Sequence, residues 1–469
     1  MASALVALSL PFGIEDPNEI IRAYAANSLF RAATADELVN EDNPFRRPVR
    51  PDDLKWLDYS TPADADSVLL LGGLLGHRML RNVYDADLLY LPAGGDSTTW
   101  ADSQSFYSME NRIRGELAGP VLERYLFTFL ADERVPLSSP RPDALEEHVR
   151  ASYDDLRAQP GRAFEVAGRT RNRRDSAVYI LLQLTAMLPA AHHAVGRNAL
   201  GEYDLAHSGL RTLLLDDYRR WVERSSLYSQ LLVDSGLIAA PGAYWQFYLT
   251  SSLARANHLH FVARGKERVF EFLGAWIYKR IDEAATSTRY ASVIHDALGV
   301  APAYFQRIEE LTEGGVAQLL NDLVAPLYKK YGQSAVESVY AGFEDARWLA
   351  KSWDSDLATQ LDWADHIEDY KDRAERIAEK LAVENIEVDL DTFIESAEET
   401  STTHVHDEHR LVIIESGQMH FWNNVGHKIA LSEGDKLLIP TSRLHGSVVL
   451  SGMCTYHQPI IPDEMFREF

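Results

Sequence analysis

The periodicity of the apolar residues changes once along this chain of 469 residues. Up to about residue 382, apolar side chains recur every three or four positions in long segments, which is the spacing of amphipathic helices. After about residue 384 the chain breaks into short alternating segments separated by turn residues, which is the pattern of β-strands. The sequence therefore predicts a multidomain α + β protein, in which a long helical part precedes a small β domain.

The helical part divides into two regions. Residues 1–145 are predicted to be mostly helical around the proline-rich loop 44–51, and their aromatic residues suit either dimerisation or, as the favoured interpretation, an ordinary core. These aromatic residues are Tyr107, Tyr125, Phe127 and Phe129. Residues 146–383 are predicted to form an all-α bundle, because long helices follow one another without strands between them. Its clearest helices are expected at 176–188, 226–237, 267–281 and 315–331.

The end of the helical part is rich in charged residues. Residues 363–381 carry Asp, Glu, Lys and Arg at three- and four-residue spacings, which predicts a solvated connecting helix. Residues 386–390 then alternate between apolar and acidic side chains, as a strand does. Residues 384–469 are therefore predicted to be a separate β domain that begins with this strand.

Composition limits the kind of partner and compartment. A formal net charge of −24 argues against nucleic acid and against anionic membrane surfaces, so small molecules or proteins are the expected partners. The single cysteine, Cys454, excludes an intrachain disulfide, and the residues after Met1 lack the basic flank of a secretory signal. No apolar run approaches the length that spans a bilayer. We therefore expect a cytoplasmic protein that binds no nucleic acid and no membrane.

The β domain carries a histidine pattern typical of metal sites. His404 and His406 are separated by one residue, so on a strand they project from the same face. The stretch from Gly434 to Pro440 reads as a turn, an apolar strand and a strand-ending proline, which would bring His445 back towards the first two. This is the spacing by which a β-barrel of the cupin type gathers three imidazoles around one metal. A cupin whose histidines are not used in catalysis is the alternative.

The rest of the β domain supplies two further candidates. Cupins usually have a glutamate ligand four residues beyond the second histidine, and this chain has Arg410 there. If the alternation holds, Arg410 points into the barrel and could bind a substrate carboxylate; pairing with Asp407 or Glu408 is the alternative. Tyr456 shares a strand face with Cys454 and Gln458, and could orient a ligand or be an ordinary buried tyrosine. The remaining histidines of this domain are interpreted as surface or structural: His409, His420, His427 and His457.

Three neutral imidazoles without a carboxylate leave a divalent metal its full charge and open positions. This ligand set suits Fe(II), O2 as co-substrate and a chelating or anionic substrate, although zinc or manganese would also accept it. The predicted catalytic residues are therefore Tyr456 and Arg410, and the predicted metal ligands are His404, His406 and His445. The sequence indicates no second cofactor.

Over essentially its whole length, the chain resembles the family of N-nitrosourea-forming enzymes of streptozotocin biosynthesis, in which a helical region, a heme-oxygenase-like helical domain and a cupin follow in this order. In the helical part the resemblance rests on 197–208, 216–218, 226–228, 236–237 and 304–305, and in the cupin on His404, His406, His445 and Tyr456. The resemblance implies a homodimer. It also implies a diiron helical domain that hydroxylates guanidine nitrogens of a methylated arginine, and a cupin iron that rearranges the product with O2.

The chain departs from this family at the diiron ligands. The expected ligand positions hold residues 190–193, Arg224, the carboxylate-free segment 274–280, Ile308, Thr312 and Gly315, so Asp217 is the remaining candidate. One carboxylate cannot hold two ferrous ions, and Arg219 and Arg224 would repel them. His258 and His260 are poor substitutes, because residues two apart diverge on a helix. The diiron site is therefore expected to be lost.

This loss changes the function that the resemblance implies. The chain would receive an N-hydroxylated arginine-type amino acid from a separate N-hydroxylase. Its cupin iron would then form an N–N bond, giving an N-nitroso or diazeniumdiolate group in natural-product biosynthesis. Two alternatives stay open: a different cupin dioxygenase, or a non-catalytic scaffold or ligand-binding homologue.

Overall fold

The structure is a computed structural model that describes residues 16–27, 49, 51–88, 104, 107–203, 208–239, 243–309, 311, 313–397, 400–422 and 428–469. The chain forms two compact units, one within residues 1–129 and the other running from residue 130 to the C-terminus. Most of the loop predicted at 44–51, together with Thr312 and His427, lies outside the described residues. The boundary predicted at residue 145 stays a prediction.

The N-terminal unit is helical. Asp16 caps its first helix, because the Asp16 side chain accepts a hydrogen bond of 2.9 Å from the backbone N–H of Asn18. Phe127 and Phe129 are buried in this unit, which confirms the interpretation of these two residues as core aromatics. The helices of this unit are α1 (Pro17–Ala25), the 3-10 helix η1 (Pro51–Leu54), α3 (Leu71–Asp85) and α5 (Met109–Phe127).

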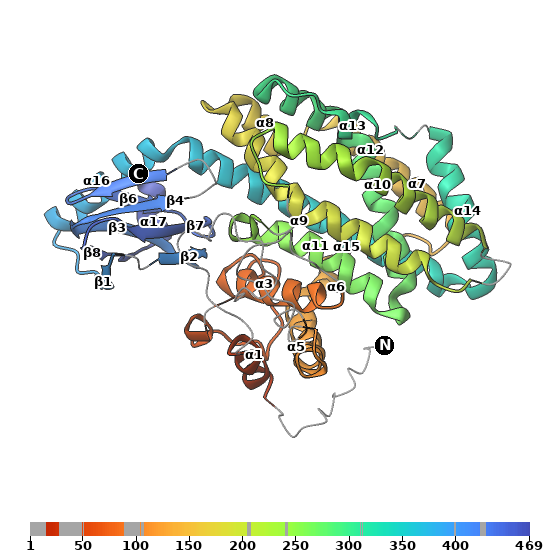
Figure 1. The fold of residues 1–469 in the computed structure, drawn as a ribbon, viewed down its shortest axis with the longest axis horizontal. Coiled ribbons are helices and arrows are strands. Elements are labelled where there is room, and N and C mark those ends of the chain that lie inside the picture. Colours follow the sequence, from red (N-terminus) through yellow and green to blue (C-terminus); the bar gives the residue numbers. More distant parts are fainter. Residues whose placement is uncertain are drawn as a thin grey trace. The chain divides into compact units, whose positions relative to one another are not determined.

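The second unit begins with the predicted helical bundle, in which the long helices α9, α11, α12 and α15 run side by side (Figure 1). The four predicted helices are found in α9, α10, α12 and α14, although α10 ends at Asp234, before the predicted end at residue 237, and α12 begins at Val269, after the 3-10 helix η4. The bounds in chain order are α6 (Leu130–Glu133), α7 (Pro142–Ala158), α8 (Arg162–Arg169), α9 (Arg173–Ala199), α10 (Ser208–Asp234), η3 (Trp245–Phe247), α11 (Thr250–Arg264), η4 (Lys266–Arg268), α12 (Val269–Leu298), α13 (Ala303–Gln306), α14 (Glu313–Tyr331), α15 (Gln333–Asp365) and α16 (Ile367–Val383).

Two glycines allow α12 and α15 to pack backbone against backbone. A Cβ on Gly274 would lie 1.8 Å from the carbonyl oxygen of Val339, and a Cβ on Gly342 would lie 1.9 Å from that of Glu271. Neither position can therefore accept a side chain without moving a helix.

Helix α9 corrects the expectation that no apolar run approaches the length that spans a bilayer, because it is, among the described residues, the one helix that is long and apolar enough to do so. In this fold, however, 78% of its apolar segment is buried inside the bundle. Its hydropathy is that of a core helix, because it packs against α10 and α11.

Helix α16 corrects the prediction of a solvated connecting helix. The long helix α15 ends at Asp365, and α16 begins at Ile367 after a break at His366. Ile367, Ile377 and Leu381 lie on one buried face of α16 and pack against the β domain. The charged residues occupy the opposite face, so the charge-rich sequence concealed an amphipathic helix.

The β domain consists of two antiparallel sheets. One sheet has the order β1-β8-β3-β6 with β9 paired to β3, and the other has the order β2-β7-β4-β5. The strands are β1 (Thr392–Ser396), β2 (Thr400–His404), β3 (His409–Ser416), β4 (Gln418–Trp422), β5 (Lys428–Ser432), β6 (Lys436–Ile439), β7 (His445–Val449), β8 (Met453–His457) and β9 (Ile460–Ile461), followed by helix α17 (Asp463–Glu468). The strand predicted at 386–390 is wrong, because the first strand begins at Thr392.

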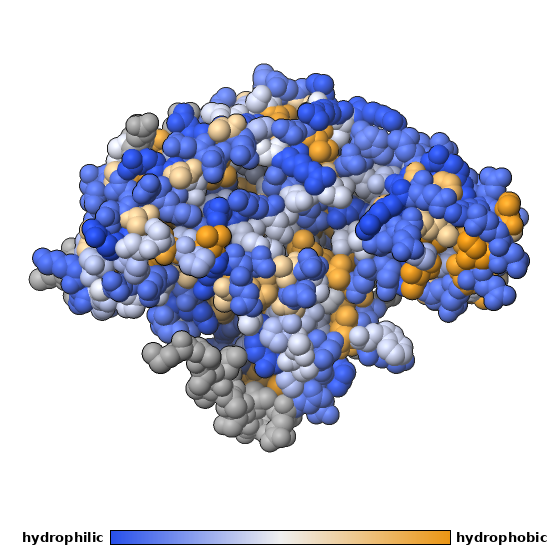
Figure 2. Space-filling model, turned by 180° about the vertical axis from the view of Figure 1, so that it is seen from behind, coloured by the Kyte–Doolittle hydropathy of each residue, from blue (hydrophilic) through white to orange (hydrophobic). Residues whose placement is uncertain are grey.

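The inner faces of the two sheets share one core. Ile414 and Leu437 come from one sheet and Phe421 and Ile429 from the other, and all four are buried together. The predicted order of a helical part and a C-terminal β domain is thereby confirmed. The molecular face in Figure 2 is mainly hydrophilic, with apolar residues in small groups, as expected for a chain with a formal net charge of −24.

Candidate metal centre

Three histidines converge at one end of the β domain. His404 ends β2 and His445 begins β7, and these two residues are direct partners in the antiparallel pairing of the two strands. His406 follows two residues after His404. The ring centroids are 4.5 Å apart for His404 and His445, 4.8 Å for His404 and His406, and 5.1 Å for His406 and His445. The structure thus brings together the three residues that the sequence predicts as ligands.

Two of the rings are oriented by backbone carbonyl groups. The Nδ1 of His445 lies 2.8 Å from the carbonyl oxygen of Arg443, and the Nδ1 of His404 lies 2.9 Å from that of Thr402. Since a carbonyl can only accept, each Nδ1 carries the proton and each Nε2 keeps its lone pair. This is the arrangement of imidazoles that bind a metal through Nε2.

At least two of the three imidazole rings are uncharged, as ligands of a metal cation must be. Burial, reinforced by the neighbouring imidazoles, lowers the pKa of His406 and His445 well below the usual value, so both rings are neutral. The Nε2 atoms of His406 and His445 are buried without a hydrogen-bond partner in the described part of the chain.

The donor set fits a metal. One ligand atom from each of His404, His406 and His445 lies within 4.8 Å of the other two, and no other such group of His, Cys, Asp or Glu occurs among the described residues. Neutral nitrogen donors of this kind suit iron, zinc or manganese, and three protein ligands leave positions for other molecules.

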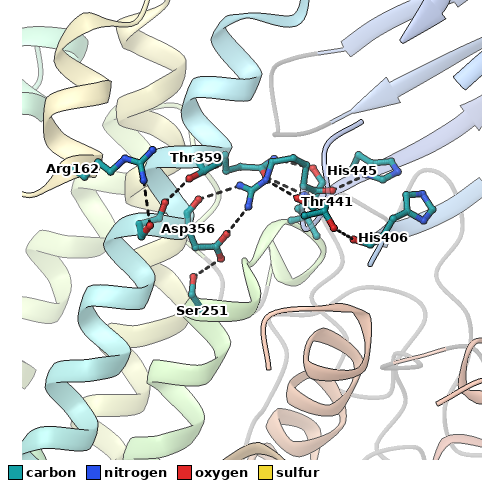
Figure 3. Close-up of polar contacts among 11 residues, drawn as sticks. Arg162, Ser251, Asp356, Thr359, His406, Thr441 and His445 are labelled. Atoms are coloured by element: carbon teal, nitrogen blue, oxygen red, sulfur yellow. Dashed lines mark hydrogen bonds and ion pairs between the residues drawn. The ribbon is translucent and has the colours of Figure 1, made fainter. Parts of the chain in front are cut away.

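The helical bundle holds the strand that carries His445 (Figure 3). Arg443 forms a buried ion pair of 3.3 Å with Asp356 of α15, and a second hydrogen bond to the carbonyl oxygen of Asp356. Ser251 of α11 donates a hydrogen bond of 2.7 Å to the same carboxylate. Because Arg443 also supplies the carbonyl that orients His445, the ion pair fixes the backbone beside a predicted ligand.

The residues next to His445 and His404 are held in the same way. Gln360 of α15 donates to the carbonyl oxygen of Leu444 at 2.9 Å and accepts from the Leu444 N–H at 3.0 Å. On the other strand, the backbone N–H of Thr403 donates to the side-chain oxygen of Gln246 at 3.1 Å. Sequence reasoning missed these bundle residues, since a glutamine or aspartate on a helix gives no local signal of a distant partner.

Arg410 and Tyr456 both have partners within the β domain. The guanidinium of Arg410 lies 2.9 Å from Asp391 and 3.4 Å from Glu408, so the ion pair weighed as the alternative for Arg410 is present. The Tyr456 hydroxyl donates to Glu395 at 3.0 Å, and its ring is buried and stacked on Phe393. A catalytic role for either residue stays a prediction.

The other histidines of the β domain lie outside the three-histidine group. The His409 ring stacks on Phe466 at 3.6 Å, and its Nδ1 accepts from the Thr441 N–H. The Nδ1 of His457 lies 2.9 Å from the hydroxyl of Thr392. These contacts agree with their interpretation as surface or structural residues.

In the helical bundle, the carboxylate of Asp217, the remaining candidate metal ligand, already contacts other side chains of the chain. Asp217 accepts hydrogen bonds from Trp276 at 2.9 Å and Arg280 at 2.7 Å, and Lys279 lies 3.6 Å away. Although burial would raise the pKa of Asp217, the charges of Lys279 and Arg280 hold it well below the usual value. His258 faces Asp345 at 3.7 Å. Cationic side chains therefore surround the carboxylate that the sequence left as a ligand candidate.

The fold and the three-histidine group define a class of protein: a helical bundle joined to a C-terminal β domain with a candidate metal centre. No family model matches the chain. The chain is similar to nitrosourea synthase from Streptomyces achromogenes subsp. streptozoticus, with 28% identity over 443 residues that cover 93% of this chain and 94% of that protein. This similarity extends through the helical part and the β domain, and it confirms the resemblance predicted from the sequence.

Proposed function

We propose that this chain is a metalloenzyme that forms an N–N bond, producing an N-nitroso or diazeniumdiolate group in natural-product biosynthesis. The observation that carries the proposal is the group of three converging imidazoles, two of which have buried Nε2 atoms without a partner in the described part of the chain. The full-length similarity to nitrosourea synthase supports the kind of product.

The proposed metal is one Fe(II), held by His404, His406 and His445 in the cupin-type β domain. A ferrous ion bound there would supply O2 binding and electron transfer. The chain itself would orient the rings through the carbonyls of Arg443 and Thr402, and hold the backbone beside them against the bundle through Arg443 and Thr403. Zinc or manganese is the alternative occupant of the same donors.

The proposed substrate is an N-hydroxylated arginine-type amino acid. Because Asp217 is occupied by Trp276, Lys279 and Arg280, the bundle is proposed to lack N-hydroxylation activity, and a separate N-hydroxylase would supply the substrate. O2 would be the oxidant that accepts the electrons released when the N–N bond forms. Arg410 and Tyr456 remain the proposed contacts to the substrate, and the working form is proposed to be a homodimer.

The first test is metal analysis of the full chain after anaerobic loading with Fe(II). We expect about one iron per chain, whereas about three would mean that the bundle also holds a diiron site. The loaded protein is then given N-hydroxylated and unmodified methylarginine under O2, and the products are identified by mass spectrometry.

The result of this experiment distinguishes the proposed N–N bond-forming enzyme from another dioxygenase and from a protein that binds no metal. An N-nitroso or diazeniumdiolate product from the hydroxylated substrate alone supports the proposal. Bound iron with O2 consumption but a different product indicates another dioxygenase. A chain that binds no iron, zinc or manganese contradicts the metalloenzyme proposal.

A further inference from the structure

We propose that the helical bundle contains an oxyanion-binding site, formed by arginines at the mouth of an internal cavity and separate from the three-histidine group. A pocket of about 150 Å³ is lined by Arg220 and Arg224 of α10, Arg280 of α12 and Arg307 after α13. Four guanidinium groups around one small pocket favour carboxylate or phosphate, which the planar guanidinium binds through two parallel hydrogen bonds.

Each of the three acidic residues of this pocket lies within 4.0 Å of a cation, and one of these cations, Arg220, also lines the pocket. Glu309 pairs with Arg220 at 3.2 Å, Glu283 pairs with Lys279 at 3.1 Å, and Glu223 lies 3.6 Å from Arg219.

Only some of the four pocket arginines have a carboxylate partner. Arg280 is committed to Asp217 at 2.7 Å. Arg224 and Arg307 have no carboxylate of the described residues within 4.0 Å. Two positive charges at this mouth therefore lack a counter-ion within the part of the chain that the structure describes.

Arg224 is the informative member, because it is only 8% exposed. Its Nε donates to the carbonyl oxygen of Arg220 at 3.2 Å, and its guanidinium lies 5.7 Å from the ring centroid of Tyr304. These contacts position the side chain without neutralising it. Since a buried charge is stable only when it is paired, an anion in the pocket is the partner that this arrangement lacks.

A second cavity indicates the shape of the ligand. A space of about 80 Å³ shares Glu283 and Ile308 with the arginine pocket, and is lined mainly by apolar and aromatic side chains together with a few charged ones such as Arg255 and Asp282. The Tyr304 hydroxyl lines this inner space, is fully buried, and has no hydrogen-bond partner among the described residues. The inferred ligand is therefore a small molecule with a carboxylate or phosphate head at the arginines and a short tail that reaches Tyr304.

The experiment is a calorimetric titration of the full chain with inorganic phosphate and, separately, with acetate at low ionic strength. The chain carries a formal net charge of −24, which disfavours unspecific binding of anions. We expect saturable binding of at least one probe, weakened at least about tenfold in Arg224→Gln and Arg307→Gln. The preferred probe distinguishes a phosphate head from a carboxylate head.

Arg211→Gln is the matched control, because Arg211 lies on the same helix, is exposed, and neither it nor its partner Glu202 lines the pocket. We expect the Arg211→Gln affinity to stay within about twofold of the wild type. Arg307 is exposed, so its variant tests the site even if Arg224→Gln fails to fold. Absence of binding for both probes, or equal weakening in Arg211→Gln, overturns the inference and leaves the proposed metal centre untouched.

Discussion

The guanidinium of Arg443 lies 3.3 Å from Oδ1 of Asp356, and both side chains are more than nine-tenths buried. Arg443 belongs to the loop before β7, whereas Asp356 lies in the C-terminal third of α15. The pair therefore connects the strand that carries His445 to the longest helix of the bundle. The helical part can in this way determine the geometry of the candidate metal centre, although none of the three histidines belongs to it.

The first prediction concerns this pair. Asp356→Ala leaves Arg443 buried without a counter-ion, so we expect the free energy of unfolding to fall by about 3 kcal/mol. Glu337→Ala is the control, because Glu337 is exposed on the same helix, and we expect its effect to stay within about 0.5 kcal/mol. Urea unfolding followed by circular dichroism measures both. Equal effects of the two substitutions would show that the pair does not stabilise the fold.

The second prediction concerns Gln360. Gln360→Leu removes the partners of the Leu444 N–H and carbonyl, so the backbone beside His445 loses two hydrogen bonds. Because misplaced ligands bind metal less tightly, we expect the Fe(II) affinity to fall about tenfold. Anaerobic titration with Fe(II) measures this. Thr359→Ala, at the neighbouring, partly exposed residue, should leave the affinity unchanged.

The third prediction concerns the ligands themselves. His445→Ala removes one of three donors, so we expect the Fe(II) affinity to fall at least about a hundredfold. His420→Ala, in strand β4 and outside the three-histidine group, should keep the wild-type iron content. Metal analysis after desalting checks the pair of variants. Iron retained by His445→Ala would place the metal elsewhere.

The fourth prediction concerns pH and the N-terminal unit. Burial lowers the pKa of His77 to about 3, so the folded chain keeps this ring neutral while the unfolded chain protonates it below about 6.5. The contribution of His77 to stability is complete above pH 6.5 and is lost as pH falls towards 3. Between pH 6.5 and 5 the α3 amides should therefore lose about 2 kcal/mol of protection.

Hydrogen exchange of the α3 amides at pH 7, 6 and 5 measures this loss. In His77→Gln we expect the pH dependence to be reduced by the same amount. His366→Gln, which changes a partly exposed histidine of the second unit, should leave it unchanged. Identical pH dependence in wild type and His77→Gln would contradict the predicted neutral ring.

The fifth prediction concerns the close contact of α12 and α15. Gly274→Ala places a Cβ 1.8 Å from the Val339 carbonyl oxygen, so the helices must separate, and we expect a loss of about 3 kcal/mol. Gly209→Ala is the control, because a Cβ there meets nothing within 4 Å. It should stabilise the chain by up to about 1 kcal/mol. Thermal unfolding of the two variants measures both changes, and the difference between them is the effect of the close helix contact, because both variants replace glycine by alanine in a helix.

Local patterns in the sequence predicted the features that depend on local geometry. The turn at Gly434 leads through β6 to His445, as predicted, whereas β2 ends at His404, so His406 lies just beyond the strand and not on it. The predicted convergence of the three histidines is nevertheless present. The same reasoning failed for α16, because the charged residues on its exposed face outnumber the four buried ones. It could not identify Asp356 or Gln360, whose roles depend on tertiary contacts with residues more than 80 positions away.

Strand β2 occupies the edge of its sheet, with β7 on one side. In the full chain, Thr403 of β2 donates hydrogen bonds to the side-chain oxygen of Gln246 in the bundle. If residues 384–469 were expressed alone, this edge would lose that cover and present open backbone groups to a second copy. Such a fragment would be prone to aggregate through β2, so attempts to purify the metal-binding portion in isolation should keep the bundle attached.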